Sequence, residues 1–318
     1  MTIAPIILFT FNRLEHTKRT VEALKQNSLA SETELYIYSD GPRDENERKI
    51  VNEVRDYIKT IRGFKKITII EQNKNKGLAN SIIDGVNDIF NKYERVIVLE
   101  DDLVTSKYFL EYMNESLEVY NNRQDIWSIA GYSPNINIPN SYSEEVYLTK
   151  RGCSWGWATW KNRWILNDWN IDDYDKFIKN KKLKIKFNEV GNDMTLMLRD
   201  QMEGRINSWA IRWCYNQFKN NMWTVYPLKS YIDNIGNDLT GTHSAMSDKY
   251  KINLVNKKIH PNYNIEVNDK ICKEFKRFND LNFFGYIGII FRKIGLYKWG
   301  RSIRNKIIIL KKSKKRNG

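Results

Sequence analysis

The stretch RVIVLEDD, Arg95 to Asp102, decides the fold class, because a short apolar run leads directly into three consecutive acids. A short run of Val, Ile and Leu is typical of a strand buried on both faces, as in parallel sheets. Three earlier runs share this character, and amphipathic segments of helical period separate them. The predicted strands are PIILFT (5–10), ELYIYS (34–39), ITIIE (67–71) and RVIVL (95–99), and the predicted helices span 15–26, 45–61, 78–91 and 107–120.

This alternation predicts an α/β fold with a mostly parallel sheet, right-handed crossovers and helices on both faces. The pattern changes after about residue 129, where eight of the ten tryptophans fall between Trp155 and Trp223. We expect a strand at 142–149, a Trp- and Gly-rich segment at 151–164, a solvated basic helix face at 179–186, helices at 194–202 and 208–219, a strand at 223–226 and a loop at 234–244.

Composition and charge narrow the class of protein. Three well-separated cysteines without a CxxC pair support neither a disulfide framework nor a zinc site. The N-terminus has no signal-peptide pattern and no stretch is apolar for long enough to span a membrane, so a cytoplasmic protein is expected. The net charge is +14, but eleven Lys and Arg and no acid follow Leu281, and subtracting them leaves only +3 for the rest.

Polar residues follow each of the four predicted parallel strands. These strand ends are 10–13, 39–41, 72–73 and 100–102. In open α/β sheets, ligands bind beyond the carboxyl ends of the strands. We therefore expect these segments to lie together and to form the binding site.

The triplet Glu100, Asp101 and Asp102 is the first candidate site. Adjacent carboxylates repel one another, and Mg²⁺ or Mn²⁺ held by one or two of them with phosphate oxygens would relieve that repulsion. Such a metal would neutralise a diphosphate leaving group. In the alternative interpretation, Asp102 only caps the following helix.

The first two strand ends offer donor contacts. Thr10, Asn12 and Arg13 can present backbone groups to a base and a guanidinium to phosphate, although Arg13 can instead pair only with nearby acids. Asp40, in Ser-Asp-Gly, can accept from a uracil N–H or merely open the turn.

Three further segments carry candidate residues. In NKGLAN, Lys76, Gly77 and Asn80 can approach a ligand at a helix start, or simply cap the helix. Trp155, Gly156 and Trp157 make a flat apolar face for a sugar ring, or a tryptophan-rich corner of the core. His243 lies in a Gly-rich loop, where it completes the metal site or is merely exposed.

The sequence resembles the GT-A glycosyltransferases, in particular the branch similar to N-acetylglucosaminyltransferase I and bacterial surface-polysaccharide transferases. The likeness runs from about Pro5 to Ser244, and its strings are FTFNR, YSDGP, NKGLANSI, VIVLEDDL, SWGWATW, INSWAIRW and NIGNDLTGTH. It implies a GT-A domain over 1–250, with a nucleotide-sugar half (1–128) and an acceptor half (129–250), followed by an extension with a basic tail (251–318).

The resemblance also assigns roles to residues. It makes Thr10 and Arg13 nucleoside and diphosphate contacts, Asp40 the uracil-reading carboxylate and Glu100 a donor-sugar contact. Asp101 and Asp102 match the DxD-type motif, with Asp102 and His243 on the metal. In related sequences an acid lies in the segment that corresponds to 207–212, but here NSWAIR has none. Asp200 and Glu203, three apart on one helical face, are therefore the candidate general bases.

The tail mixes aromatic and aliphatic residues with Lys and Arg from Phe283 to Leu310, and it ends in KKSKKRNG. This pattern is typical of an amphipathic helix on an anionic membrane. Nucleic acid is the competing partner, but the chain has no RNA-binding motif and its body is not basic. We expect a protein peripheral to the inner face of the cell membrane. The alternative is a helix packed on the body.

Together with the resemblance, these patterns predict a metal-dependent transferase that uses a UDP-sugar and a glycan or lipid-linked acceptor. Inversion and a role in surface-polysaccharide synthesis are implied by the resemblance alone. A nucleotidyltransferase that makes sugar nucleotides is one alternative, although FTFNR lacks the glycine-rich loop of those enzymes. A sugar-binding protein on a decayed transferase fold is the other.

Overall fold

The computed structural model describes residues 2–236, 248–282 and 285. His243 and nearly all of the basic tail lie outside the described residues. Within the described part of the chain, no helix combines the length and the apolar character needed to cross a bilayer.

One eight-stranded sheet runs through the molecule, in the order β3-β2-β1-β4-β8-β6-β9-β7. All neighbouring pairs are parallel except those that involve β8 or β7, so six strands share one direction. The strands are β1 (Ile6–Thr10), β2 (Glu34–Ser39), β3 (Lys66–Glu71), β4 (Arg95–Glu100), β6 (Ile126–Ala130), β7 (Val146–Thr149), β8 (Trp157–Trp160) and β9 (Trp223–Pro227). The predicted mostly parallel α/β sheet is confirmed.

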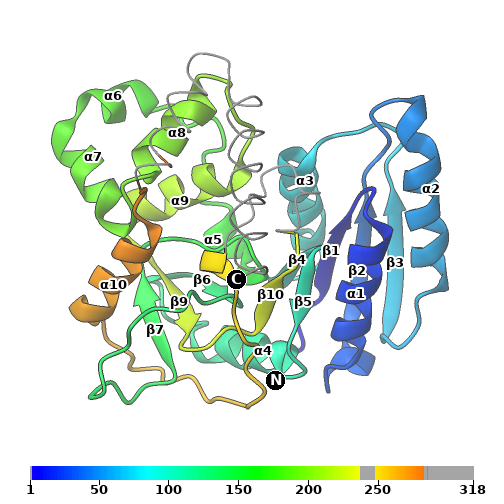
Figure 1. Ribbon diagram of the computed structural model, residues 1–318, viewed down its shortest axis with the longest axis horizontal. Helices are drawn as coiled ribbons and strands as arrows, with labels where there is room; N and C mark the ends of the chain where they lie inside the picture. Colours follow the sequence, from blue (N-terminus) through cyan, green and yellow to red (C-terminus); the bar gives the residue numbers. More distant parts are fainter. Residues whose placement is uncertain (1, 237–247, 283–284, 286–318) are drawn as a thin grey trace, which may run out of the picture.

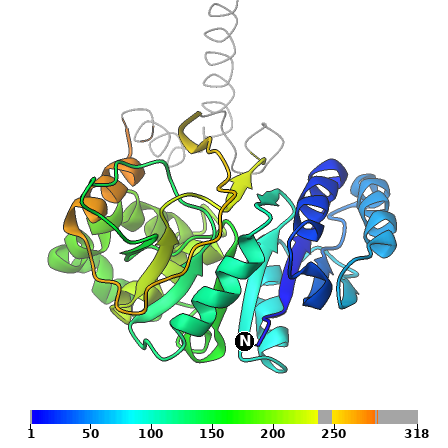
Figure 2. The same ribbon diagram turned by 90° about the horizontal axis from the view of Figure 1, so that it is seen from below.

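Helices cover both faces of this sheet (Figures 1 and 2). Successive residues of β1 enter different cores, with Ile6 and Leu8 in one cluster and Ile7 and Phe9 in the other. This alternation explains why the strand is apolar throughout. The first cluster takes residues from α1 (Leu14–Lys25), α2 (Glu45–Thr60) and α4 (Phe109–Val119), and the second takes them from α3 (Leu78–Phe90) and α9 (Trp209–Lys219).

The second half of the sheet departs more from the prediction. The Trp- and Gly-rich segment 151–164 forms β8 and the short helix α5 (Lys161–Trp164), and β6 has no counterpart among the predicted strands. The strand predicted at 142–149 occupies only 146–149. The remaining helices are α6 (Tyr174–Lys179), α7 (Lys181–Phe187), α8 (Met194–Met202) and α10 (Asp269–Asn279).

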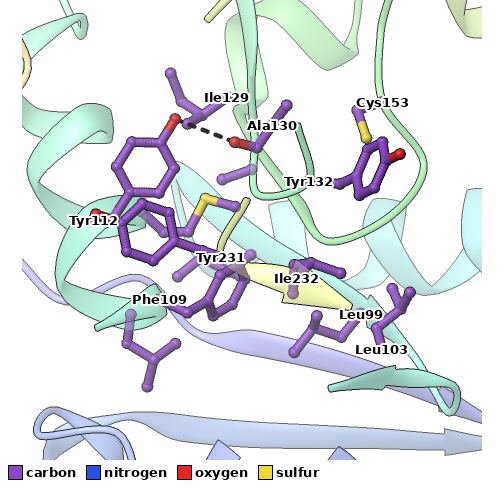
Figure 3. Packing of buried hydrophobic residues seen from close by; sticks show 14 of the residues in the cluster. Leu99, Leu103, Phe109, Tyr112, Ile129, Ala130, Tyr132, Cys153, Tyr231 and Ile232 are labelled. Carbon is purple, nitrogen blue, oxygen red and sulfur yellow. Dashed lines mark hydrogen bonds between the residues drawn. The ribbon is translucent and has the colours of Figure 1, made fainter. Parts of the chain in front are cut away.

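A second, two-stranded sheet places the acidic triplet. β5 (Leu103–Thr105) follows Asp102 directly and pairs antiparallel with β10 (Ile232–Asn234). Beneath it, Leu99, Leu103, Phe109 and Ile232 are buried in one apolar cluster (Figure 3). Glycine is required at 131 and 156, because a Cβ at either position would lie within 2.9 Å of the Ile232 side chain. The triplet is therefore flanked on both sides by side chains of the core.

Candidate functional site

The backbone of the acidic triplet is held by elements that are distant in sequence. Glu100 ends β4, and Asp101 and Asp102 form the turn into β5. The Thr20 hydroxyl on α1 donates to the Asp101 carbonyl at 2.8 Å, and the Ile235 N–H after β10 donates to the Asp102 carbonyl at 2.9 Å. These contacts fix where the carboxylates stand before any ligand arrives.

Arg13 reaches the acids from the end of β1. Its Nη1 donates to Asp102 Oδ2 at 2.8 Å and lies 3.8 Å from Asp101 Oδ1. The Phe11 N–H also points to Asp101, at 3.4 Å from Oδ2. Arg13 therefore pairs with nearby acids, as the alternative interpretation expected.

The remaining acidic charge is incompletely compensated. Burial raises the pKa of Asp101 to about 7, the charge of Asp102 adds to this rise, and Arg13 opposes it. Burial also raises the pKa of Glu100 well above its ordinary value, and Asp102 and Asp101 raise it further. A group of acids with raised pKa values is stabilised by a proton or by a cation.

Polar atoms without partners surround the same point. Thr10 Oγ1, Arg13 Nε and Arg13 Nη2 are buried, and none of them has a hydrogen-bond partner among the described residues. Buried polar atoms are normally paired. These donors therefore suit a ligand rich in acceptor oxygens, such as a phosphate.

The donor set also fits a hard divalent cation. Asp101 and Asp102 supply carboxylate oxygens, which Mg²⁺ and Mn²⁺ prefer. Gly236 lies against this group, because a Cβ there would fall 2.1 Å from Asp102 Oδ2. Within 2–236, 248–282 and 285, however, no group of three or more His, Cys, Asp or Glu could hold a metal. His243, the other predicted ligand, lies outside that part of the chain.

Asp40 is engaged by the protein itself. Oδ1 accepts from the N–H groups of Gly41 (2.9 Å) and Lys76 (2.8 Å), and Oδ2 accepts from Asn75 Nδ2 (3.0 Å) and the Gly77 N–H (3.0 Å). A carboxylate has about four acceptor positions. The structure thus favours the turn-forming interpretation, since all four positions are filled and a uracil N–H would have to displace one donor.

The loop that Asp40 holds carries the predicted donor residues 76–80. Gly77 precedes α3 with φ of 74°, and its Cβ position is open. The Lys76 ammonium pairs with Asp84 at 2.7 Å, and Asn80 Nδ2 donates to the Lys76 carbonyl at 3.0 Å. Both backbone groups of Gly77 are already bonded, the N–H to Asp40 and the carbonyl to the Ser81 N–H at 3.0 Å. What Gly77 offers an approaching ligand is the open space at its Cβ position.

The residues of the predicted sugar-binding face differ in burial, since Trp157 lies in the core and Trp155 lies nearer the surface. Trp157 is 1% exposed, and its ring lies 4.5 Å from that of Trp213 and 5.8 Å from that of Trp164. Stacking of a sugar on Trp157 is therefore wrong, because its faces are covered by other rings. Gly156 is needed to accommodate Ile232. Trp155 is only partly buried, edge-on to Tyr132 at 4.7 Å, and remains a candidate.

The two candidate bases occupy the end of α8 and the residue after it. Asp200 is 1% exposed and accepts from Arg205 Nε at 2.9 Å. A buried, ion-paired carboxylate is a poor acceptor of a substrate proton, so the structure argues against Asp200. Glu203 is exposed and also paired with Arg205.

Asp233 on β10 is a candidate that the sequence pattern did not reveal. Strand alternation turns it away from the core, because its neighbour Ile232 is fully buried. Asp233 is partly buried, and no hydrogen bond or ion pair joins its carboxylate to the described residues. Burial raises its pKa, while Arg19 and Lys251 oppose the rise. Asp233 is recognised as a candidate only from the structure, because β10 pairs with β5, the strand that follows the acidic triplet.

Comparison with solved structures gives distant likenesses with TM-scores below 0.5. A mannosyltransferase from Pyrobaculum calidifontis, in complex with GDP-Man and Mn²⁺, is 13% identical (TM-score 0.36) over 50% of this chain and 45% of its own. S. aureus TarS is 12% identical (TM-score 0.39) over 73% and 36%. LgtC with donor and acceptor sugar analogues is 11% identical (TM-score 0.37) over 70% and 72%. The chain thus spans less than half the length of the first two.

Comparison with curated proteins gives no match. A family profile, Glycosyl transferase family 2, matches residues 6–199. These residues include the strands β1 to β4, the acidic triplet and Arg13. Because the match covers more than half of the chain, it confirms the resemblance to glycosyltransferases, and the chain belongs to glycosyl transferase family 2.

Proposed function

We propose that this glycosyltransferase moves a hexosyl or N-acetylhexosaminyl group from a UDP-sugar to a glycan or lipid-linked acceptor, with inversion, in the synthesis of bacterial surface polysaccharide such as lipopolysaccharide or capsule. One observation carries the donor half of this proposal. Arg13 stands between the carboxylates of Asp101 and Asp102 with two nitrogens unpaired among the described residues. A site that combines acids with unpaired donors suits a metal-bound diphosphate.

In the donor half, Asp102 and His243 would hold Mn²⁺ or Mg²⁺, with Asp101 beside them. When bound, the metal would neutralise the charge that develops on the departing UDP. Arg13 would exchange part of its contact with Asp102 for the diphosphate oxygens, and Thr10 Oγ1 would pair with the nucleoside. Glu100 would contact the donor sugar. Lys76, Gly77 and Asn80 would contact the donor from the start of α3, where the open Cβ position of Gly77 leaves room for close approach. Asn12 would contact it from the end of β1.

The contacts of Asp40 change its proposed role. The carboxylate of Asp40 already accepts four hydrogen bonds, from Gly41, Asn75, Lys76 and Gly77. It would therefore affect binding of the UDP-sugar indirectly, by way of this loop. It would keep the loop backbone in place beside the base. Direct reading of uracil would require the loss of one of these hydrogen bonds.

In the acceptor half, Trp155 would present a partly open ring to a sugar, supported from the side by Tyr132. Asp233 would accept the proton of the acceptor hydroxyl as that oxygen attacks the anomeric carbon opposite UDP. The raised pKa of Asp233 brings it nearer to working pH, where a general base is most effective. Glu203 is the alternative base, and its exposure to solvent is the one observation that supports it.

The domain division and the cellular location belong to the same proposal. Residues 1–250 would form the transferase domain and 251–318 an extension whose basic tail binds anionic lipid on the cytoplasmic face of the membrane. Lipid-linked acceptors present their glycans at such a surface.

The test is UDP release from a panel of UDP-sugars, with and without Mn²⁺, by the wild-type protein and by Asp102→Asn. Thermal shift on the same panel identifies which nucleotide-sugars bind. Mn²⁺-stimulated release that Asp102→Asn abolishes would support transfer. Formation of a sugar nucleotide from a nucleoside triphosphate would assign a nucleotidyltransferase instead. Binding without turnover across a range of acceptors would indicate a decayed enzyme.

A further inference from the structure

A concentration of lysines lies on the corner formed by α6 and α7. Residues 176–186 read KFIKNKKLKIK, with six lysines and no acid. Five of these lysines are exposed and Lys184 is partly buried. None of the six makes an ion pair with a described residue. We call this surface the lysine corner; it comprises Lys176, Lys179, Lys181, Lys182, Lys184 and Lys186, together with Leu183 and Ile185.

The fold holds the lysine corner in a fixed conformation. Phe177 and Phe187 are each 1% exposed and meet edge-to-face at 5.5 Å, so both ends of the corner are anchored in one apolar cluster. Asn180 caps α7 by accepting from the Leu183 N–H at 3.1 Å. The residues between the two phenylalanines are thus directed outwards by packing.

Two aliphatic side chains stand among the lysines. Leu183 is 38% exposed and Ile185 is 60% exposed. Isolated exposed aliphatic residues are common. Leu183 and Ile185 are two residues apart on α7 and so lie on different sides of the helix. Ile185, the more exposed of the two, shares this short helix with four lysines and can enter the boundary between headgroups and acyl chains. Nucleic acid would satisfy the charge, but its phosphate backbone offers little to Ile185.

We propose that the lysine corner is a second membrane-contact surface, which binds anionic lipid headgroups through its lysines and the acyl boundary through Ile185. The corner lies at the end of the molecule opposite α2 (Figure 1). It belongs to the acceptor half of the chain, so contact here would bring that half to a lipid surface. The inference does not depend on the proposed transfer reaction or on the basic tail.

The test uses the full-length protein and sedimentation with vesicles of phosphatidylcholine, alone or mixed with phosphatidylglycerol. Each lysine near an anionic surface contributes about fivefold to binding. Replacing four should therefore weaken binding to the mixed vesicles by at least about tenfold. The variant is Lys181→Gln, Lys182→Gln, Lys184→Gln and Lys186→Gln combined. The single change Ile185→Ser should weaken binding without any change in charge.

A matched control removes the same charge from the opposite half of the fold, where four exposed lysines lie outside the corner: Lys49→Gln, Lys65→Gln, Lys66→Gln and Lys92→Gln. The control should retain most of the binding. Equal losses in both quadruple variants, or no loss in either, would overturn the inference. So would lysine-dependent binding to a single-stranded oligonucleotide with none to the vesicles. UDP release on a soluble acceptor should be the same in all variants, which separates this outcome from failure of the proposed reaction.

Discussion

Arg13 Nη1 lies 2.8 Å from Asp102 Oδ2, so the guanidinium already pairs with the carboxylate that is proposed to hold the metal. Both side chains are largely shielded from solvent, with exposed fractions of 17% and 14%. A cation is thus already present at the acidic triplet before a donor binds. The ion pair compensates part of the acidic charge of the triplet, and under the proposed function a metal and a diphosphate would compete with it.

Replacing Arg13 with Met should destabilise the metal-free protein at pH values above about 7, because Asp101 and Asp102 lose their compensating charge. A partly buried pair of this kind contributes about 1–3 kcal/mol. Mn²⁺ should then raise the melting temperature of the variant more than that of the wild type. Thermal unfolding with and without Mn²⁺ measures both effects.

Arg19→Met is the matched control, since Arg19 is an exposed arginine on α1, the helix that begins directly after Arg13. It should leave the melting temperature and the response to Mn²⁺ close to those of the wild type. An Arg13→Met protein as stable as this control would show that the ion pair is not what compensates the acids.

The pKa of Asp101 predicts a pH-dependent metal affinity. Its folded-state pKa of about 7 lies above the ordinary 3.8, so the folded carboxyl is protonated below about pH 7. Protonated Asp101 therefore contributes to the free energy of unfolding. This contribution is complete below the pKa of the unfolded state and is lost as the pH rises through about 7. A metal needs the ionised form. Mn²⁺ affinity, followed by electron paramagnetic resonance, should therefore rise between about pH 6 and pH 8.

Asp101→Asn removes the titrating group and should flatten this pH profile, even if the affinity itself falls. Asp56→Asn, at an exposed position on α2, should leave the profile unchanged. A profile of the same shape in Asp101→Asn and the wild type would place the controlling proton on another group.

Asp40→Asn should weaken donor binding through the loop. The amide nitrogen would face N–H donors where the carboxylate now accepts, which leaves at least one buried group unpaired at a cost of about 1–3 kcal/mol. We expect the KM for the donor to rise by about tenfold, while kcat changes little. Steady-state kinetics and urea unfolding measure the two consequences, with Asp56→Asn again as the control. A fall in kcat alone would contradict a role confined to the loop.

The sequence predicts the first half of the fold closely for a physical reason. Each strand from β1 to β4 has apolar residues on both faces, and each following helix carries one apolar stripe. The strand pattern and the helix pattern therefore differ clearly along the sequence. In the second half this contrast disappears. β8 is built from Trp157 to Trp160 inside a tryptophan cluster, and such residues suit a core, a pocket or a strand equally well.

The site follows the same division. Residues at strand ends could be predicted, since a parallel sheet brings those ends together, and Arg13 meets the acids as a result. Asp233 could not be predicted, because its position depends on the antiparallel pairing of β10 with the three-residue strand β5. Neither strand is long enough to show a period. The burial of Asp200 depends on Arg205, five residues away, and charge pattern alone does not distinguish a paired acid from a free one.

Asp233→Asn should lower kcat by about 10²–10⁴, because the acceptor hydroxyl would lose the group that takes its proton. Binding of UDP and Mn²⁺ should be unchanged, since Asp233 faces away from Ile232 and has no contact with Arg13 or Asp102 among the described residues. Pre-steady-state transfer and UDP titration separate the two effects. Glu203→Gln is the matched control, an acid-to-amide change at an exposed site on the acceptor half. If Glu203→Gln loses transfer and Asp233→Asn keeps it, the base lies after α8. If both keep it, neither acid takes the proton.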